Sequence, residues 1–259
     1  MLRKFAASAR NTLPPAIVAL AASWLLSVTV YAGKSYLLPG PYGVAIAAAS
    51  HATMLARAAL LTFEEALAGY VLASAAGIVL AATMSQSRVL ERSVYPYAVM
   101  LQTVPVVAVA PLIVLWFGYG EISVIVMSFI MALFPIVSNT LLGLQSTPRT
   151  LVELFAMHRS SKLVTFWKLR LPGALPHVVG GLRISAGLSV IGAIVGEFII
   201  GSGNSRGGLG VQIIFAQGRM YTALLLSEVI AATLLGFLFF VVVGAIGRRL
   251  LHHWHESAG

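Results

Sequence analysis

The sequence predicts an all-α membrane protein that crosses the bilayer several times. Of its 259 residues, 59% are hydrophobic and only 10% are charged, whereas a soluble domain carries about 25% charged residues. The apolar residues gather into long runs, and about 20 such residues suffice for a helix to cross about 30 Å of hydrocarbon. Composition and run length together exclude a soluble globular fold.

Six runs approach or exceed the length of a transmembrane helix. They are Ala16–Ala32, Ala66–Met84, Tyr95–Phe117, Ile122–Leu144, His177–Ile200 and Ala223–Ile246. An alanine-rich segment, Pro41–Leu60, lies between the first two runs and contains His51 and Arg57. Counting it as a seventh span would invert the orientation of every later loop.

Charge placement decides between these two arrangements. With six spans and the N-terminus inside, most of the 17 Lys and Arg residues lie on the cytoplasmic side, as the positive-inside rule requires. The segment 41–60 is therefore predicted to be an amphipathic helix on the outer surface. Residues 1–15 form a cytoplasmic N-terminus, 16–249 a single transmembrane domain and 250–259 a cytoplasmic tail. No cleavage site follows the first run, which is read as a retained anchor.

One charged segment, Leu151–Pro176, interrupts the apolar runs. It holds Arg159, Lys162, Lys168 and Arg170, and each charge would cost about 2.5–3.5 kcal/mol at the centre of a bilayer. The segment must therefore face water. Its apolar residues recur at helical spacing, which predicts short helices that break near residues 159–161. Pro172 and Pro176 are predicted to end it, because proline disfavours helical geometry in the preceding residue.

The spacing within this segment resembles the cytoplasmic EAA loop of ATP-binding cassette (ABC) importer permeases. Glu153 is followed six residues later by a turn position, then by Ser161 and a Leu-Pro step at Leu171. Two further stretches, Thr103–Gly120 and Gly181–Ile199, are similar to the nitrate, sulfonate and taurine branch, which includes thiamine-precursor permeases. The resemblance covers about residues 37–249. It departs at Arg159-Ser160, where the family usually has Gly-Ala.

The resemblance implies a type I importer permease of the smaller kind in a bacterial inner membrane, with both termini cytoplasmic. Its expected partners are a second copy of the chain, ABC ATPase subunits and an outer substrate-binding protein. Its expected solute is a nitrate-, sulfonate- or taurine-like anion or a pyrimidine precursor of thiamine. Residues 145–176 would form the coupling loop, with these contact residues: Glu153, Phe155, Met157, Arg159, Ser161, Leu163, Phe166, Leu171 and Pro172.

Chemistry alone leaves this loop open to a second interpretation. A helix that docks on a protein needs apolar anchors on one face, but a basic surface helix can instead meet anionic lipid headgroups. The substitution at Arg159 has two interpretations of its own. Either the turn is made differently from the family, or Arg159 contacts the ATPase.

The solute path is predicted along the third to fifth runs. Prolines in these runs leave backbone carbonyls unpaired, which a membrane tolerates where protein or a water-filled cavity covers them. The candidate path residues are Gln102, Pro105, Pro111, Asn139, Ser189 and Glu197. The alternatives are that the prolines are packing kinks, that the serine serves helix packing, and that Glu197 reaches interfacial water. Arg183 is expected to reach the cytoplasmic face.

The sequence also argues against several chemistries. It has no Cys and no GxxxxGK[ST] motif, and all eight acidic residues are Glu, so ATP hydrolysis is assigned to another chain. The glycine-rich stretch 201–210 lacks the Lys-Ser/Thr of a phosphate loop. No metal site, cofactor or enzymatic activity is predicted. Two rival functions remain: an ion-coupled secondary transporter, which needs acids near the midplane, and a scaffold without transport.

Overall fold

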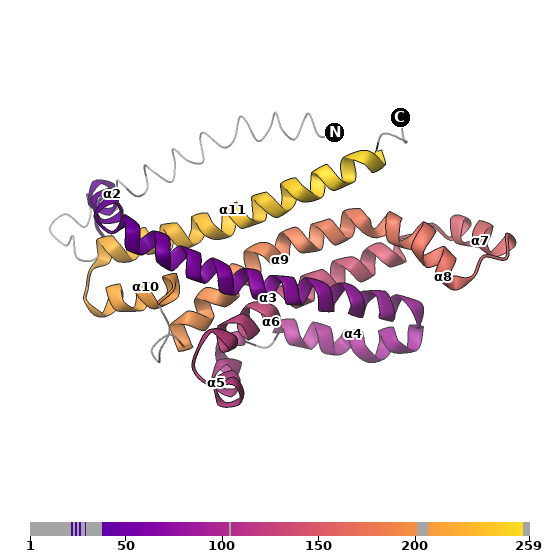
Figure 1. Cartoon of the computed structure of the whole chain (residues 1–259), viewed down its shortest axis with the longest axis horizontal. Coiled ribbons are helices and arrows are strands. Elements are labelled where there is room, and N and C mark those ends of the chain that lie inside the picture. The colour runs from indigo at the N-terminus through magenta and orange to yellow at the C-terminus, as the bar shows by residue number, and fades with distance from the viewer. Residues whose placement is uncertain are drawn as a thin grey trace.

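The computed structural model describes residues 38–103, 105–200 and 207–255, and four separate positions before them, 22, 24, 26 and 29. Regular structure within these ranges is helical throughout (Figure 1), which confirms the predicted all-α class. The N-terminal residues 1–15 lie outside the described residues, and so does the predicted first run, Ala16–Ala32, apart from the four separate positions.

Four helices within the described ranges are long and apolar enough to cross a membrane. They are α3 (Ala52–Gln86), α6 (Glu121–Gln145), α9 (Leu171–Ile200) and α11 (Thr222–His255), and they run along the long axis of the molecule (Figure 1). They contain the second, fourth, fifth and sixth predicted runs, which are thereby confirmed as membrane-spanning candidates. The predicted count of six spans is not confirmed by this part of the chain.

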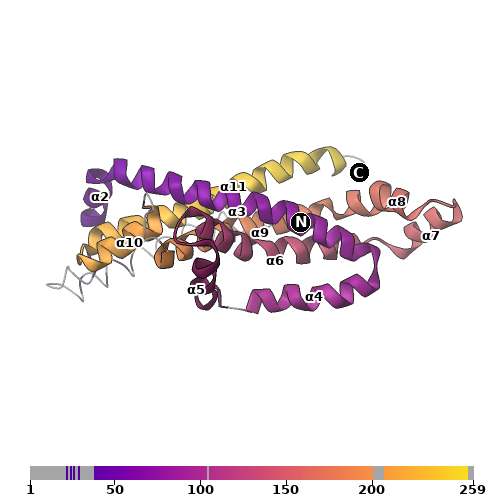
Figure 2. The same ribbon diagram turned by 60° about the horizontal axis from the view of Figure 1, so that its bottom comes forward.

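The third predicted run, Tyr95–Phe117, is not one helix. The structure divides it into α4 (Arg88–Thr103) and α5 (Val106–Phe117). Pro105 precedes α5 with extended backbone angles, φ −63° and ψ 109°, because its ring excludes a continuous helix through this point. α5 consequently turns away from the direction of α4 (Figure 2).

The predicted surface helix over 41–60 is also wrong as a single element. The segment forms α2 (Pro41–Ser50) and, after a break at His51, the first turns of α3. α3 therefore has 35 residues, about 52 Å at 1.5 Å per residue. That length exceeds the hydrocarbon thickness of about 30 Å, and the predicted apolar run 66–84 covers only the C-terminal part of this helix.

The centre of the bundle is α6, which packs most extensively against α9 and α3. Ser128 of α6 lies between Gly69 of α3 and Gly192 of α9, where an added Cβ would lie 2.5 Å from Ser128 Oγ and 2.8 Å from Ser128 Cα, respectively. Ser128 Oγ donates to Ala66 O at 3.3 Å. Small residues therefore bring the three backbones close together, which is a common basis of helix association in membranes.

α11 completes the bundle through an aromatic contact with α3. The ring of Phe239 makes edge-on contacts with Phe63 and Tyr70 at centroid distances of 5.3 and 5.0 Å. A short apolar helix, α10 (Leu209–Gly218), packs against α9 and α11. It lies at the end of the bundle opposite α7 (Arg149–Met157) and α8 (Lys162–Thr165) (Figure 1).

Candidate functional site

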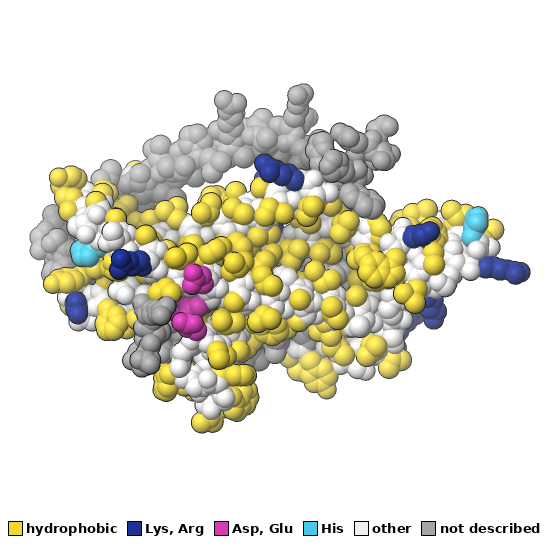
Figure 3. Space-filling view, in the orientation of Figure 1, with side chains coloured by type: hydrophobic (Ala, Val, Ile, Leu, Met, Phe, Trp, Pro, Cys, Tyr) yellow, Lys and Arg dark blue, Asp and Glu magenta, His cyan; other side chains and the backbone are white. Residues whose placement is uncertain are grey.

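The predicted coupling loop is a helical hairpin that projects from one end of the bundle (Figure 1). It consists of α7, a turn, α8 and a π-helical turn over Phe166–Arg170. Hydrophobic side chains cover much of the long helices on the face shown in Figure 3, and several Lys and Arg side chains lie at the end formed by α7 and α8. The predicted break between the two short helices is confirmed.

The turn between α7 and α8 places Arg159 in the left-handed region, at φ 55°. Arg159 N donates to Ala156 O at 2.9 Å and Ser160 N donates to Phe155 O at 3.1 Å, which is the hydrogen-bond pattern of a Schellman C-cap. Glycine is the usual residue at this position, since a side chain makes the conformation costly. The turn is therefore made in the glycine conformation despite the arginine, which removes the hypothesis of a different turn.

The second half of the hairpin leads into α9 without the predicted end at the prolines. Ser161 Oγ accepts a hydrogen bond from Val164 N at 3.3 Å and caps α8. Pro172 lies in the first turn of α9 and Pro176 lies inside that helix. The preceding turn has a wider, π-helical bonding pattern, with Leu171 N donating to Phe166 O, and such a local adjustment accommodates proline in a helix.

The apolar residues of the loop divide into an inner and an outer set. Phe166 is only 8% exposed and packs with Leu144, Ala174 and Val178, so it anchors the loop to its own bundle. Met157 and Leu163 are 81% and 70% exposed. Of the other predicted contact residues, Glu153, Arg159 and Ser161 are exposed, and Phe155, Leu171 and Pro172 are half-buried.

The predicted path residues that the structure describes lie in different surroundings. Pro105 is exposed at the start of α5 and Pro111 is exposed within that helix. The side chain of Gln102 lies outside the described part. Asn139 Nδ2 donates to Pro135 O at 2.8 Å. Ser189 is fully buried and its Oγ donates to Ala186 O at 2.9 Å, a local bond of the kind expected for helix packing.

Glu197 is buried at the end of the bundle opposite the coupling loop. It is 3% exposed, and its Oε1 accepts from Thr62 Oγ1 at 2.6 Å. Its Oε2 accepts from Gly210 N at 2.5 Å, and Leu209 N donates to Thr62 Oγ1 at 2.8 Å. Because Gly208, which precedes α10, has no side chain to cap that helix, α3 and α9 supply the acceptors that its first N–H groups require.

This cluster, which we call the α10 cap (Thr62, Glu197, Leu209 and Gly210), includes residues that sequence reasoning missed. Thr62 and Glu197 are 135 positions apart, and no local pattern connects them. The Glu197 side chain also lies at the N-terminus of a helix, where the backbone N–H groups and the helix dipole favour an acidic group. The cap therefore joins α3, α9 and α10 at one point.

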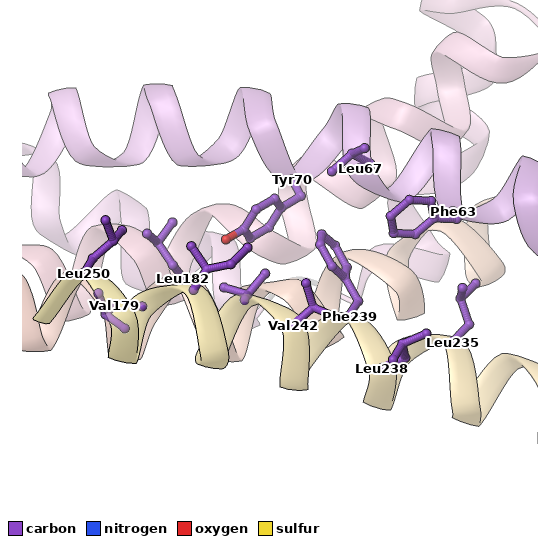
Figure 4. Close-up of a pocket in the computed structure, with 13 residues that line it drawn as sticks. Phe63, Leu67, Tyr70, Val179, Leu182, Leu235, Leu238, Phe239, Val242 and Leu250 are labelled. Atoms are coloured by element: carbon purple, nitrogen blue, oxygen red, sulfur yellow. The ribbon is translucent and has the colours of Figure 1, made fainter. Parts of the chain in front are cut away.

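A separate apolar cavity of about 470 Å³ lies between α3, α9 and α11. Figure 4 shows Phe63 and Tyr70 of α3, Leu182 of α9 and Phe239 of α11 around it. Its lining contains none of the predicted path residues. The described residues contain no group of three or more His, Cys, Asp or Glu side chains that could hold a metal ion.

The long apolar helices are those of an integral membrane protein, and an amphipathic hairpin projects from one end of its bundle. Residues 73–252 match the family described as binding-protein-dependent transport system inner membrane component. Because this match covers more than half of the chain, the protein belongs to that family. It is an ABC importer permease of the multi-pass inner-membrane type.

Two curated relatives illustrate the range of this branch. The chain is 34% identical over 247 residues to the riboflavin transport system permease protein RibX of Chloroflexus aurantiacus, covering 95% of this chain and 90% of the relative. It is 35% identical over 233 residues to the formylaminopyrimidine transport permease protein ThiX of Halalkalibacterium halodurans, covering 88% of this chain and 90% of the relative.

A solved structure agrees with the fold. An amino acid ABC transporter crystallised with histidines matches with a TM-score of 0.63 at 15% identity, covering 79% of this chain and 97% of that chain. The family match and the curated relatives confirm the predicted family, an ABC importer permease of this branch.

Proposed function

We propose that two copies of this chain enclose the solute path of an ATP-driven importer and that residues 145–176 of each copy dock on an ATPase subunit. The observation that carries the docking proposal is the hairpin of α7 and α8. It projects from the bundle and exposes Met157 and Leu163, while the buried Phe166 holds its base. Exposed apolar anchors on a fixed helical element are what a groove on a soluble partner recognises.

The helical connection to α9 supports a mechanism of coupling. The helical segment Lys162–Ile199 forms one candidate membrane span, and Arg170 Nη1 donates to Ser85 O of α3 at 3.4 Å. A displacement of the hairpin by closure of the ATPase pair would therefore be transmitted to α9 and α3. Such closure shifts the population between inward-open and outward-open arrangements, and the permease itself performs no covalent chemistry.

The solute remains within the classes that the family resemblance implies. We propose a small solute, either a nitrate-, sulfonate- or taurine-like anion or a pyrimidine precursor of thiamine, delivered by an outer binding protein. The relatives named for riboflavin and formylaminopyrimidine fit the heterocyclic alternative, and the relatives named for aliphatic sulfonates and nitrate fit the anion. The proposed path residues are Gln102, Pro105, Pro111, Asn139, Ser189 and Glu197. We also propose that both termini lie in the cytoplasm.

Co-purification from mild-detergent membranes tests the docking proposal. The tagged wild type should recover a nucleotide-hydrolysing subunit, and Met157→Asp or Glu153→Arg should reduce that recovery at least tenfold. Tyr42→Asp is the matched control, because Tyr42 is 80% exposed on α2 and lies outside the hairpin. Equal recovery with Met157→Asp and wild type would overturn the assigned surface. Absence of any ATPase from the wild type would remove the proposed coupling.

Uptake measurements separate this function from an ion-coupled transporter. Uptake by the complete transporter should continue when an uncoupler collapses the ion gradient and ATP is kept high. Both oxygens of Glu197 are already engaged within the α10 cap, which does not favour a role for this carboxylate as an ion carrier. Uptake abolished by the uncoupler under these conditions would favour the ion-coupled alternative.

A further inference from the structure

Arg183 is a charged residue inside the apolar part of α9 that has no acidic partner in the described residues. Its Nε is buried without a hydrogen-bond partner, and its guanidinium carbon lies 4.1 Å from the centre of the Phe240 ring on α11. Glu197, on the same helix, is 14 positions further on, about 21 Å at 1.5 Å per residue. An ionisable group at membrane depth indicates a functional site by default.

The surface of α11 is shaped around this side chain. An added Cβ at Gly244 would lie 2.8 Å from Arg183 Nε and 3.0 Å from its Cδ. Glycine at position 244 therefore leaves the space in which the guanidinium lies. Phe240 stacks against one side of that space, as cations commonly do on aromatic rings.

A second cation lies on the same face of α11, one helical turn closer to the end that carries the coupling loop. Gly244 and Arg248 are four positions apart, and residues at this spacing are neighbours on a helix surface. Arg248 is exposed, and side chains on a helix lean toward its N-terminus, which directs Arg248 back toward the level of Gly244. This spacing places a second cation on the face of α11 that carries Gly244, toward the end of the membrane span.

We infer that the seam of Arg183, Phe240, Gly244 and Arg248 binds the phosphate of an anionic phospholipid. Guanidinium groups bind phosphate oxygens with good geometry, and basic pockets between transmembrane helices take anionic headgroups. Phe237, seven positions before Gly244 on the same face, is 63% exposed and provides an apolar surface for an acyl chain. This arrangement, apolar toward the membrane interior and cationic toward its edge, matches a lipid rather than a free solute.

Lipid retention tests the inference without reference to transport. Native mass spectrometry of the purified chain in micelles with equal phosphatidylglycerol and phosphatidylcholine should show preferential retention of phosphatidylglycerol. Arg183→Gln should lower the retention ratio about fivefold, the effect of one cation near an anionic surface, and Arg183→Lys should keep part of it. Arg57→Gln, which removes an exposed cation near the opposite end of the bundle, should leave the ratio unchanged.

Two glycine variants test the same site if the arginine variants fail to fold. Gly244→Ala keeps every charge but displaces the guanidinium, so it should also lower the ratio. Gly180→Ala is its control on α9, since an added Cβ there meets nothing within 4 Å. An unchanged ratio in both Arg183→Gln and Gly244→Ala would overturn the site. Displacement of phosphatidylglycerol by millimolar inorganic phosphate would overturn the lipid source and assign the site to a free oxyanion.

Discussion

The carboxylate of Glu197 accepts a 2.6 Å hydrogen bond from Thr62, a residue on a different helix and 135 positions away. The same hydroxyl accepts a hydrogen bond from Leu209 N, so one threonine joins α3 to α9 and to the start of α10. Both side chains are buried. Since a buried polar group left unpaired costs more than a paired one contributes, the α10 cap should contribute to stability as a unit.

Thr62→Val is the variant that breaks this unit with little change in shape. It removes the donor to Glu197 and the acceptor for Leu209 N, and each buried group left unsatisfied costs about 1–3 kcal/mol. We expect a clear fall in the apparent unfolding temperature of the detergent-solubilised protein. The control is Thr233→Val on α11, because Thr233 is exposed and bonds only to Val229 O of its own helix. Equal falls in both variants would contradict the special role of the cap.

Sequence reasoning predicted the break between α7 and α8 but could not find this cap, for a physical reason. Local features of the sequence predict this segment: the charges around Arg159, a Leu-Pro step and helical spacing of apolar residues. The cap depends on tertiary contact between Thr62 and Glu197, and a single threonine in an apolar run carries no signal of its partner. Of the two side chains, only Glu197 is a candidate from the sequence, because intramembrane carboxylates are rare.

Gly192→Ala tests the close contact of α9 with α6. The added methyl group would meet backbone atoms of α6, with Ser128 Cα at 2.8 Å and Met127 O at 2.9 Å, so the helices must move apart. Overpacking of this kind costs about 1–3 kcal/mol. The expected result is a lower apparent unfolding temperature. Gly236→Ala on α11 is the control, since its nearest atom is Val190 Cγ1 at an ordinary 3.7 Å; a fall of equal size there would refute the explanation.

Hydropathy predicted the four long helices because the membrane requires long apolar runs, and it placed both ends of α6 within one residue, but it missed the first turns of α3 and α9 and the last turns of α11. The composition of residues 95–117 does not show whether they form one helix or two. The backbone geometry at Pro105 separates them into α4 and α5. In α9, by contrast, Pro172 and Pro176 lie within helix. Proline therefore separates α4 from α5 but lies inside α9, where the preceding turn has π-helical bonding.

Ser161→Ala should loosen the start of α8. The side chain of Ser161 accepts from Val164 N, and loss of an N-cap costs about 0.5–2 kcal/mol of local helix stability. Amide hydrogen exchange of Val164 should become faster, with exchange in α6 unchanged. Ser161→Asp retains a capping oxygen and should restore slow exchange. Fast exchange in the aspartate variant would mean that the hydroxyl acts through something other than capping.

Arg159→Gly separates the conformational and contact roles of the residue that departs from the family pattern. Glycine adopts the positive φ of this turn without the side-chain penalty, so the isolated permease should be stabilised by about 1 kcal/mol. Met220→Gly is a matched control. Met220 has φ 57°, and the bonds Met220 N to Gln217 O and Tyr221 N to Ala216 O repeat the same C-cap.

The two glycine variants should raise the apparent unfolding temperature by similar amounts and should differ in assembly. If the Arg159 guanidinium contacts the ATPase, Arg159→Gly will recover less of that subunit than Met220→Gly, whereas Arg159→Lys, which keeps the charge and the strained turn, will recover more than Arg159→Gly. Full recovery with Arg159→Gly would show that the arginine only tolerates the turn. A lower unfolding temperature in Arg159→Gly would contradict the strain assigned to position 159.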